Sequence, residues 1–205
     1  MNAAENPDLV RFARAMVPIM ALPARRAAEL VARAENAALE VLDIAAGHGM
    51  FGIEVGRRFD RARIFALDWA PVLNVARANA DAAGLGALYF AIPGNAFSVP
   101  LGGPYDVILV PNFLHHFSAN ENIAFLRRLR AALQPNGMVV TVEFVPDAER
   151  VTPPIPAGFA LTMLLLTESG DAYTFDELKD MFRQAGFSRS ELHGLAPSPE
   201  AAILS

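Results

Sequence analysis

Hydrophobic positions along the 205-residue chain follow two alternating patterns. Short apolar runs with β-branched residues are typical of strands buried on both faces of a parallel sheet, whereas apolar residues that recur every three or four positions are typical of amphipathic helices. Strands are predicted at residues 39–44, 63–68, 88–92, 105–110, 138–144, 188–193 and 201–204, and helices at 7–18, 24–34, 51–59, 71–83, 120–133 and 174–186.

Strands that alternate with helices indicate an α/β fold. The order predicts a Rossmann-like, doubly wound, mostly parallel seven-stranded sheet with an antiparallel last strand. The two helices before the first strand form a predicted N-terminal extension, residues 1–36, ahead of a main domain at 37–205. The extension could cover a sheet edge, cap the cleft or link to another domain.

The turn after the first strand contains small residues that let a ligand approach the backbone closely. Residues 47–52 spell G-x-G-x-x-G, with Asp68 about twenty residues further on, as in dinucleotide-binding folds that bind NAD. Residues 43–49 also spell D-x-A-x-G-x-G, which resembles the D-x-G-x-G-x-G motif of class I S-adenosylmethionine (SAM) dependent methyltransferases. A tight turn without a ligand is the third interpretation. The methyltransferase interpretation assigns cofactor binding to Asp43, Ala45, Gly47 and Gly49.

Polar residues after the next strands extend this predicted cofactor site. Asp68 ends the second strand, where a carboxylate can accept hydrogen bonds from both ribose hydroxyls. Trp69 either stacks near the adenine or packs in a partly buried position. Asn95 follows the third strand in the sequence PGNAF, where its amide can pair with adenine. Ala96 beside it and Asn112 after the fourth strand complete the predicted set.

Two adjacent histidines, His115 and His116, follow the fourth strand in the sequence NFLHHF. One of them could be a general base, both could bind a metal, or both could fill the start of the next helix. A metal site is disfavoured because adjacent side chains rarely converge on one ion and no third ligand lies at a familiar spacing. Base and packing roles both stay open on these residues alone.

Composition limits the partners and the compartment. The formal net charge of −5 and the lack of long basic runs argue against nucleic acid binding. The absence of cysteine excludes disulfides and thiolate metal sites and is compatible with the cytoplasm, where we expect the protein. The longest apolar segment, 159–166, is too short to span a bilayer, so we expect no membrane partner and find no signal peptide.

Residues 146–172 form an expected insertion between the fifth strand and the last long helix. This segment is rich in proline and contains the apolar sequence GFALTMLLLT. We expect it to form a lid or wall of the substrate pocket, with Phe159, Met163 and Leu166 as an apolar lining.

Several motifs together resemble the catalytic domain of class I SAM-dependent methyltransferases, nearest to the bacterial and plant small-molecule O-methyltransferases of the caffeic acid and hydroxyneurosporene type. Members of that family usually carry an N-terminal dimerisation domain, so the resemblance implies that this chain corresponds to the methyltransferase half, either as a fragment of a longer chain or as a stand-alone form. A homodimer is expected if a longer parent chain carries that domain. The motifs occur in the family's order: VLDIAAGHG, ALDW, PGNAF, NFLHHF, LQPNG, VEFVPD and TESGDAYTFDEL.

The resemblance implies SAM as cofactor and methyl transfer to a hydroxyl of a small, mostly apolar molecule, aromatic or polyketide-like. It aligns His115 with the family's general base and Glu143 with the acid that orients this base. A second family acid aligns with Ala172, so the catalytic set is incomplete. An NAD-dependent oxidoreductase, which here lacks a Tyr-x-x-x-Lys pair, and a SAM-binding protein without catalysis remain the alternatives.

Overall fold

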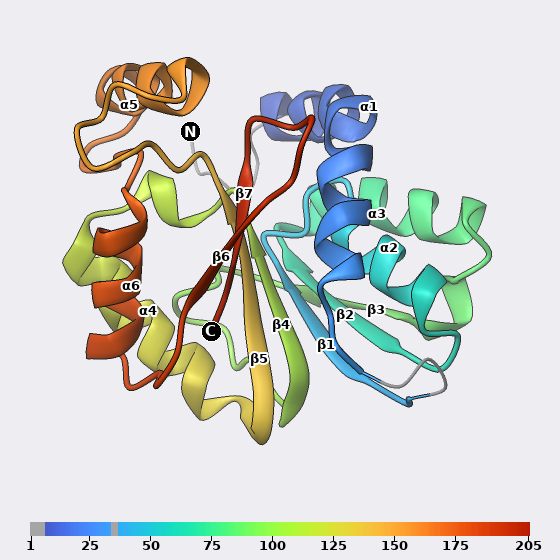
Figure 1. The fold of residues 1–205 in the computed structure, drawn as a ribbon. Helices are drawn as coiled ribbons and strands as arrows, with labels where there is room; N and C mark the ends of the chain where they lie inside the picture. Colours follow the sequence, from blue (N-terminus) through green and yellow to red (C-terminus); the bar gives the residue numbers. More distant parts are fainter. Residues whose placement is uncertain (1–6, 34–36) are drawn as a thin grey trace. The chain divides into compact units, whose positions relative to one another are not determined.

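The computed structural model describes residues 7–33 and 37–205 and has an α/β architecture (Figure 1). Seven strands form a mixed sheet in the order β3-β2-β1-β4-β5-β7-β6. The described helices and strands are, in chain order, α1 (Pro7–Glu29), β1 (Glu40–Ile44), α2 (Met50–Arg58), β2 (Arg63–Asp68), α3 (Ala70–Ala82), η2 (Gly86–Leu88), β3 (Tyr89–Pro93), β4 (Tyr105–Pro111), η3 (Leu114–His116), α4 (Ala119–Ala131), β5 (Leu133–Glu143), α5 (Pro154–Leu166), α6 (Phe175–Gln184), β6 (Glu191–Gly194) and β7 (Ala201–Leu204).

Strand directions confirm the predicted fold class. β1 pairs in parallel with β2 and β4, and β2 pairs in parallel with β3. The last strand, β7, runs antiparallel to both β5 and β6. The chain divides into two compact units, which are described separately below. The first comprises residues 1–109 and 133–137, and the second comprises 110–132 and 138–205.

The core of the first unit lies between its parallel strands and helices. Four of the five residues of β1 are buried, as the apolar run predicts for a central parallel strand. Helices α1, α2 and α3 contact one another (Figure 1). The carboxyl ends of β1, β2 and β3 lead into the turns that carry the predicted cofactor residues.

The predicted break between two N-terminal helices is wrong, because α1 continues through Pro18 and Pro23. Proline inside a helix removes a hydrogen bond and costs about 3 kcal/mol. Here a continuous buried face compensates for that cost, since tertiary packing contributes most of a helix's stability. The helix ends at Glu29, and the predicted domain boundary after residue 36 adjoins residues 34–36, which lie outside the described residues. The buried face consists of Ala13, Met20, Pro23, Ala24, Ala27 and Ala28.

In the second unit, α4 and α6 lie side by side (Figure 1). Both helices begin with the capping box that pairs an N-cap hydroxyl with a glutamate three residues on, and the predicted box at Thr174 and Glu177 is confirmed. The predicted insertion contains a helix of its own, α5. None of the helices in the described part of the chain is long and apolar enough to cross a membrane.

The start of β5 differs from the prediction. The sequence predicts a helix up to residue 133 and a strand from residue 138, but β5 already begins at Leu133. Pro135 is tolerated there because its side of the strand is exposed and needs no backbone donor.

Candidate functional site

The turn between β1 and α2 is built from left-handed backbone. Ala45, Gly47 and Gly49 have φ values of 49°, 56° and 79°. A Cβ atom added to Gly49 would lie 2.7 Å from the Tyr89 hydroxyl and 3.1 Å from the Ala76 Cβ. Small residues are therefore required here, and they leave the backbone of the turn free of bulky side chains.

Asp43 lies inside β1 and is fully buried. Its Oδ2 atom accepts a hydrogen bond from the Gly52 N–H at 3.0 Å, in the first turn of α2, whereas Oδ1 has no hydrogen-bond partner among the described residues. Burial raises the pKa of Asp43 to about 8, with the Gly52 bond opposing the rise and the Asp68 charge adding to it. Asp43 thus holds the turn, and its contact with a cofactor stays a prediction.

Asp68 connects this turn to the end of β2. Its Oδ2 accepts the Gly47 N–H at 2.8 Å, and its Oδ1 accepts the Trp69 N–H at 2.7 Å. Burial raises the pKa of Asp68, and the two backbone bonds oppose this rise. Each carboxylate oxygen has a further lone pair, so the group can still accept from a hydroxyl. Trp69 packs against the cluster of Ala13, Val72 and Val75.

The turn after β3 contains the remaining predicted cofactor residues of the first unit. Asn95 is exposed, and its Oδ1 accepts the Phe97 N–H at 2.9 Å, which closes a local turn. Its side-chain NH2 group can still donate to a ring nitrogen. Ala96 is buried.

In the second unit, Glu143 and His115 form a buried pair. Glu143, the last residue of β5, is 3% exposed and His115 is 5% exposed. The Nδ1 atom of His115 lies 2.5 Å from Oε2 of Glu143. The other carboxylate oxygen accepts the backbone N–H groups of Phe113 at 3.1 Å and Leu114 at 2.8 Å. One carboxylate therefore fixes both the turn and the ring.

This arrangement determines which nitrogen of His115 is available for chemistry. An Nδ1–H that donates to Glu143 leaves the lone pair on Nε2, where it can accept a proton. The Phe159 ring of α5 lies 4.9 Å from the His115 ring, at right angles to it, and stacks on the Phe144 ring at 4.2 Å. The side chain of Asn122 donates to the Leu114 carbonyl at 2.9 Å, which adds another hydrogen bond to the turn.

The other residues considered for this region differ in exposure, and the His116 ring lies 4.3 Å from that of His115. His116 is exposed, and no group of three or more potential metal ligands occurs among the residues that the structure describes. Of the predicted lining, Met163 is buried but Leu166 is 75% exposed. The chain next to Ala172 touches the turn, because the Asp171 N–H donates to the His115 carbonyl at 3.0 Å.

Two buried residues were missed by sequence reasoning. The Tyr89 hydroxyl lies under Gly49, and burial together with the charges of Asp43 and Asp68 raises its pKa. Glu200 is 3% exposed and hydrogen-bonds the Asn112 side chain. Tyr89 belongs to a predicted strand and could be flagged as a phenol at its start, but Glu200 carries no sequence signal because it lies in a proline- and serine-containing loop.

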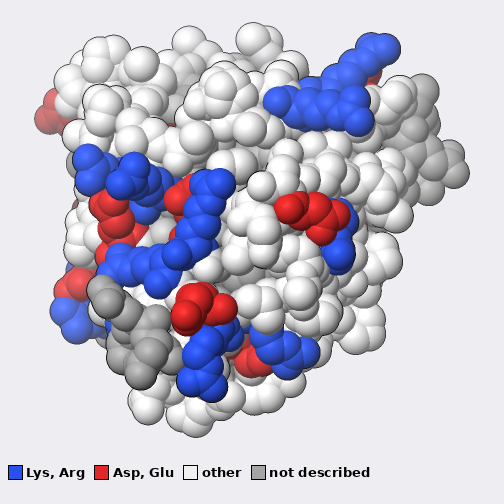
Figure 2. Space-filling model, turned by 90° about the vertical axis from the view of Figure 1, so that its right-hand side faces the viewer, with Lys and Arg blue, Asp and Glu red and all other residues white. Residues whose placement is uncertain are grey.

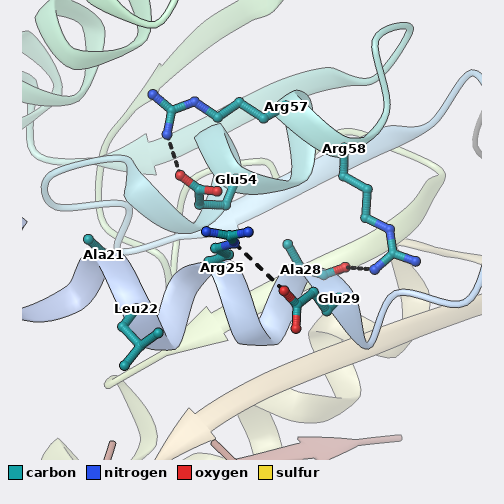
Figure 3. Close-up of a pocket in the computed structure, with 8 residues that line it drawn as sticks. All are labelled: Ala21, Leu22, Arg25, Ala28, Glu29, Glu54, Arg57 and Arg58. Atoms are coloured by element: carbon teal, nitrogen blue, oxygen red, sulfur yellow. Dashed lines mark hydrogen bonds and ion pairs between the residues drawn. The ribbon is translucent and has the colours of Figure 1, made fainter. Parts of the chain in front are cut away.

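A hollow of about 650 Å³ lies over α1 and α2 (Figure 3). None of the predicted site residues lines it. Its arginines are engaged: Arg57 pairs with Glu54, Arg25 lies 3.7 Å from Glu29, and Arg58 donates to the Ala28 carbonyl. Basic and acidic side chains also lie next to one another on the face drawn in Figure 2. Two of the three arginines in this hollow are thus paired with glutamates, and none of the catalytic or cofactor residues predicted from the sequence lies there.

Comparisons with known proteins agree with one another. A family model described as an O-methyltransferase domain matches residues 3–188. The crystal structure of a candidate O-methyltransferase from Nostoc punctiforme superposes with a TM-score of 0.93 at 47% identity, covering 98% of this chain and 60% of that one. Mouse acetylserotonin O-methyltransferase is 30% identical over 156 residues, which are 74% of this chain and 40% of that protein. Phenazine O-methyltransferase PhzM from Lysobacter antibioticus is 31% identical over 150 residues, 72% of this chain and 42% of that protein.

Coverage of the relatives is partial. The matched part of this chain corresponds to 40% of the mouse protein and 42% of the Lysobacter protein, so it spans about two fifths of these curated relatives.

Proposed function

Because the chain belongs to the O-methyltransferase domain family, we propose that it transfers a methyl group from SAM to a hydroxyl of a small, mostly apolar molecule, aromatic or polyketide-like. The buried contact of 2.5 Å between Nδ1 of His115 and Glu143 carries the proposal. The names of the relatives, acetylserotonin and phenazine O-methyltransferases, support a ring compound as acceptor.

The residues of the first unit fit a cationic nucleoside cofactor. Asp43 has a buried oxygen without a hydrogen-bond partner among the described residues, and the glycines at 47 and 49, both with positive φ, keep bulky side chains off the turn. A positive charge would stabilise the ionised forms of Asp43 and Asp68, which burial disfavours. When bound, SAM supplies an electrophilic methyl group. The proposed binding residues are Asp43, Ala45, Gly47, Gly49, Asp68, Trp69, Asn95, Ala96 and Asn112.

His115 is the proposed general base. A phenol has a pKa of about 10, so at neutral pH its proton must be removed as the oxygen reacts. The Nε2 lone pair takes that proton, and Glu143 stabilises the resulting imidazolium through Nδ1–H. The aromatic rings of Phe159 and Phe144 keep water away from the imidazole, which strengthens the Glu143 contact.

Replacement of His115 by alanine tests this proposal. We expect kcat to fall by about 10²- to 10⁴-fold, the usual contribution of a general base, while the Kd of SAM stays within about twofold. His116→Ala is the matched control, because the neighbouring ring is exposed, and it should retain activity. Turnover would be measured with radiolabelled SAM on a panel of phenols, and SAM binding by calorimetry.

The possible results separate the candidate functions. Unchanged turnover in His115→Ala would remove this residue from the mechanism. Binding of SAM without turnover on any phenol would instead support a SAM-binding protein without catalysis. Ala172 favours this alternative, because the family resemblance places an acid at that position. Binding of NAD in place of SAM would refute the methyltransferase proposal.

We further propose a cytoplasmic protein whose partners are small molecules rather than nucleic acid or membranes, in keeping with the net charge of −5. A homodimer is proposed for a parent chain that carries a dimerisation domain. Light scattering of that longer chain would measure its mass.

A further inference from the structure

Glu200 is a buried acid next to the His115 turn that the proposed mechanism does not use. It immediately precedes β7, and Ala201, the next residue, pairs with Glu143 across the antiparallel β5-β7 ladder. Only 3% of Glu200 is exposed. The register therefore brings a second carboxylate to the end of β5 at which Glu143 orients His115.

The contacts of Glu200 connect it to the beginning of that turn. Its Oε2 atom accepts a hydrogen bond from the Ser198 hydroxyl at 3.0 Å, and its carboxylate is hydrogen-bonded to the side chain of Asn112. Asn112 has a left-handed φ of 51°, and its N–H donates to the Val142 carbonyl at 2.8 Å. Asn112 is thus fixed by its backbone to β5 and by its side chain to Glu200.

We propose that Glu200 is a positioning residue for His115, which holds Asn112 and so keeps the turn 112–115 in the conformation that presents the imidazole. This inference rests on the proposed function. Glu143 holds the middle of the turn through the N–H groups of Phe113 and Leu114, and Glu200 holds its first residue. The backbone of Asp171 also contacts the turn, but its neighbour Ala172 has no polar side chain that could hold the turn.

The energetics of Glu200 agree with a role in orientation. Burial raises the pKa of its carboxyl group, and the Asn112 and Ser198 hydrogen bonds oppose that rise. The negative charge of Glu143 raises the pKa of Glu200 further, whereas His115 lowers it. A buried carboxylate destabilises a fold unless its hydrogen bonds are made, and an apolar residue of similar volume would avoid this cost. Burial of the Glu200 carboxylate is therefore not explained by a gain in stability, which leaves the orientation of Asn112 as its role.

Two substitutions at Glu200 distinguish positioning from bulk packing. In Glu200→Leu the acceptor for Asn112 is lost, and we expect kcat to fall by about 10- to 100-fold, as for a small misplacement of a catalytic group. KM for the acceptor should stay within about twofold when SAM is saturating, a condition needed because Asn112 is also a proposed SAM-binding residue. Glu200→Gln keeps an amide oxygen that can accept from Asn112 and should restore kcat to within about threefold of the wild type. Glu191→Gln and Glu191→Leu on β6 are the controls.

Hydrogen exchange supplies a measurement that does not depend on activity. We expect the amides of Phe113 and Leu114 to exchange about tenfold faster in Glu200→Leu than in the wild type and at the wild-type rate in Glu200→Gln. A double-mutant cycle with Asn112→Gly should be non-additive, with Glu200→Leu causing little further loss of kcat once the Asn112 side chain is gone.

The inference and the proposed function fail in different ways. Unchanged exchange at Phe113 and Leu114 in Glu200→Leu would overturn the positioning role, whether or not the wild type methylates any phenol. An active wild type with full kcat in Glu200→Leu, or a Glu200→Gln variant as impaired as Glu200→Leu, would also overturn it. A wild type that transfers methyl to no acceptor, with faster exchange in Glu200→Leu, would defeat only the proposed function and leave the positioning role supported.

Discussion

The turn after β1 and the turn after β4 are constructed alike. Each follows a buried strand, each contains a left-handed residue other than glycine, Ala45 in the first and Asn112 in the second, and each is held by a carboxylate that accepts backbone N–H groups. In the first turn Asp68 accepts from Gly47, and in the second Glu143 accepts from Phe113 and Leu114.

The two turns differ in what they present. The first has small residues that keep bulky side chains away from its backbone, and its acids Asp43 and Asp68 hold the turn by accepting the N–H groups of Gly52 and Gly47. The second has large residues and a titratable ring, and its acid Glu143 also contacts that ring. Under the proposed function, a buried carboxylate that holds a turn serves cofactor binding in the first turn and proton transfer in the second. Four substitutions, two in each turn, test this distinction.

The largest effect is expected from Glu143→Gln. The glutamine oxygen can still accept the two turn N–H groups, but its NH2 group would face Nδ1 of His115 and force the proton onto Nε2. The base would then be in the wrong tautomer, and kcat should fall on the order of 10³-fold, as in other His-acid pairs changed in this way. Steady-state kinetics measures the fall, and calorimetry should show unchanged SAM affinity.

Asp43→Asn is the matched change in the first turn and should leave kcat at saturating SAM within a few-fold of the wild type, since Asn can also accept from Gly52. Comparable losses of kcat in the Asp43 and Glu143 variants would erase the distinction between a binding turn and a catalytic turn.

The two turns also differ in how far the sequence predicts them. The first turn and its acids follow one another along the chain, so motifs in the sequence pointed to Asp43, Gly47, Gly49 and Asp68, and the structure brings these residues together in one turn. Their contacts with a cofactor stay predictions. The contact of Glu143 with His115 joins residues that are 28 positions apart, and it was inferred from family resemblance rather than from spacing.

Glu200 could not be found from sequence, because only the pairing of β5 with β7 brings it to the turn. The strand pattern gave the fold class because buried parallel strands have a strong apolar signal. The helix pattern failed at α1, because the packing of its buried face outweighs the effect of two prolines inside the helix.

A smaller effect is expected in the pH dependence of stability. The native pKa of Asp43 is about 8 and its ordinary value is 3.8, so between these values the folded protein binds a proton that the unfolded chain has lost. The stabilisation by protonated Asp43 is complete below pH 4 and is lost as pH rises toward 8. From pH 5 to pH 8 the wild type should lose about 1 kcal/mol per pH unit relative to Asp43→Asn, in urea unfolding at several pH values. Parallel pH profiles of the two proteins would contradict this prediction.

The smallest effect is expected at the left-handed residues. Alanine with positive φ costs about 1–2 kcal/mol, and glycine costs about 0.5–1 kcal/mol in chain entropy, so Ala45→Gly should stabilise the fold by about 0.5 kcal/mol in urea unfolding. Ala46→Gly is the control, because Ala46 is buried and lacks a positive φ, and it should lose about 1 kcal/mol.

Asn112→Gly tests the same backbone conformation in the second turn, where φ is 51° compared with 49° at Ala45. Asparagine already tolerates this region, so glycine relieves little strain, and the variant loses the hydrogen bond to Glu200, which leaves a buried carboxylate with one partner fewer. We therefore expect Asn112→Gly to destabilise the fold, opposite in sign to Ala45→Gly. If glycine stabilises the fold at both positions, the hydrogen bond of the Asn112 side chain to Glu200 contributes no net stability, and the residues at 45 and 112 matter only for the backbone conformation of their turns.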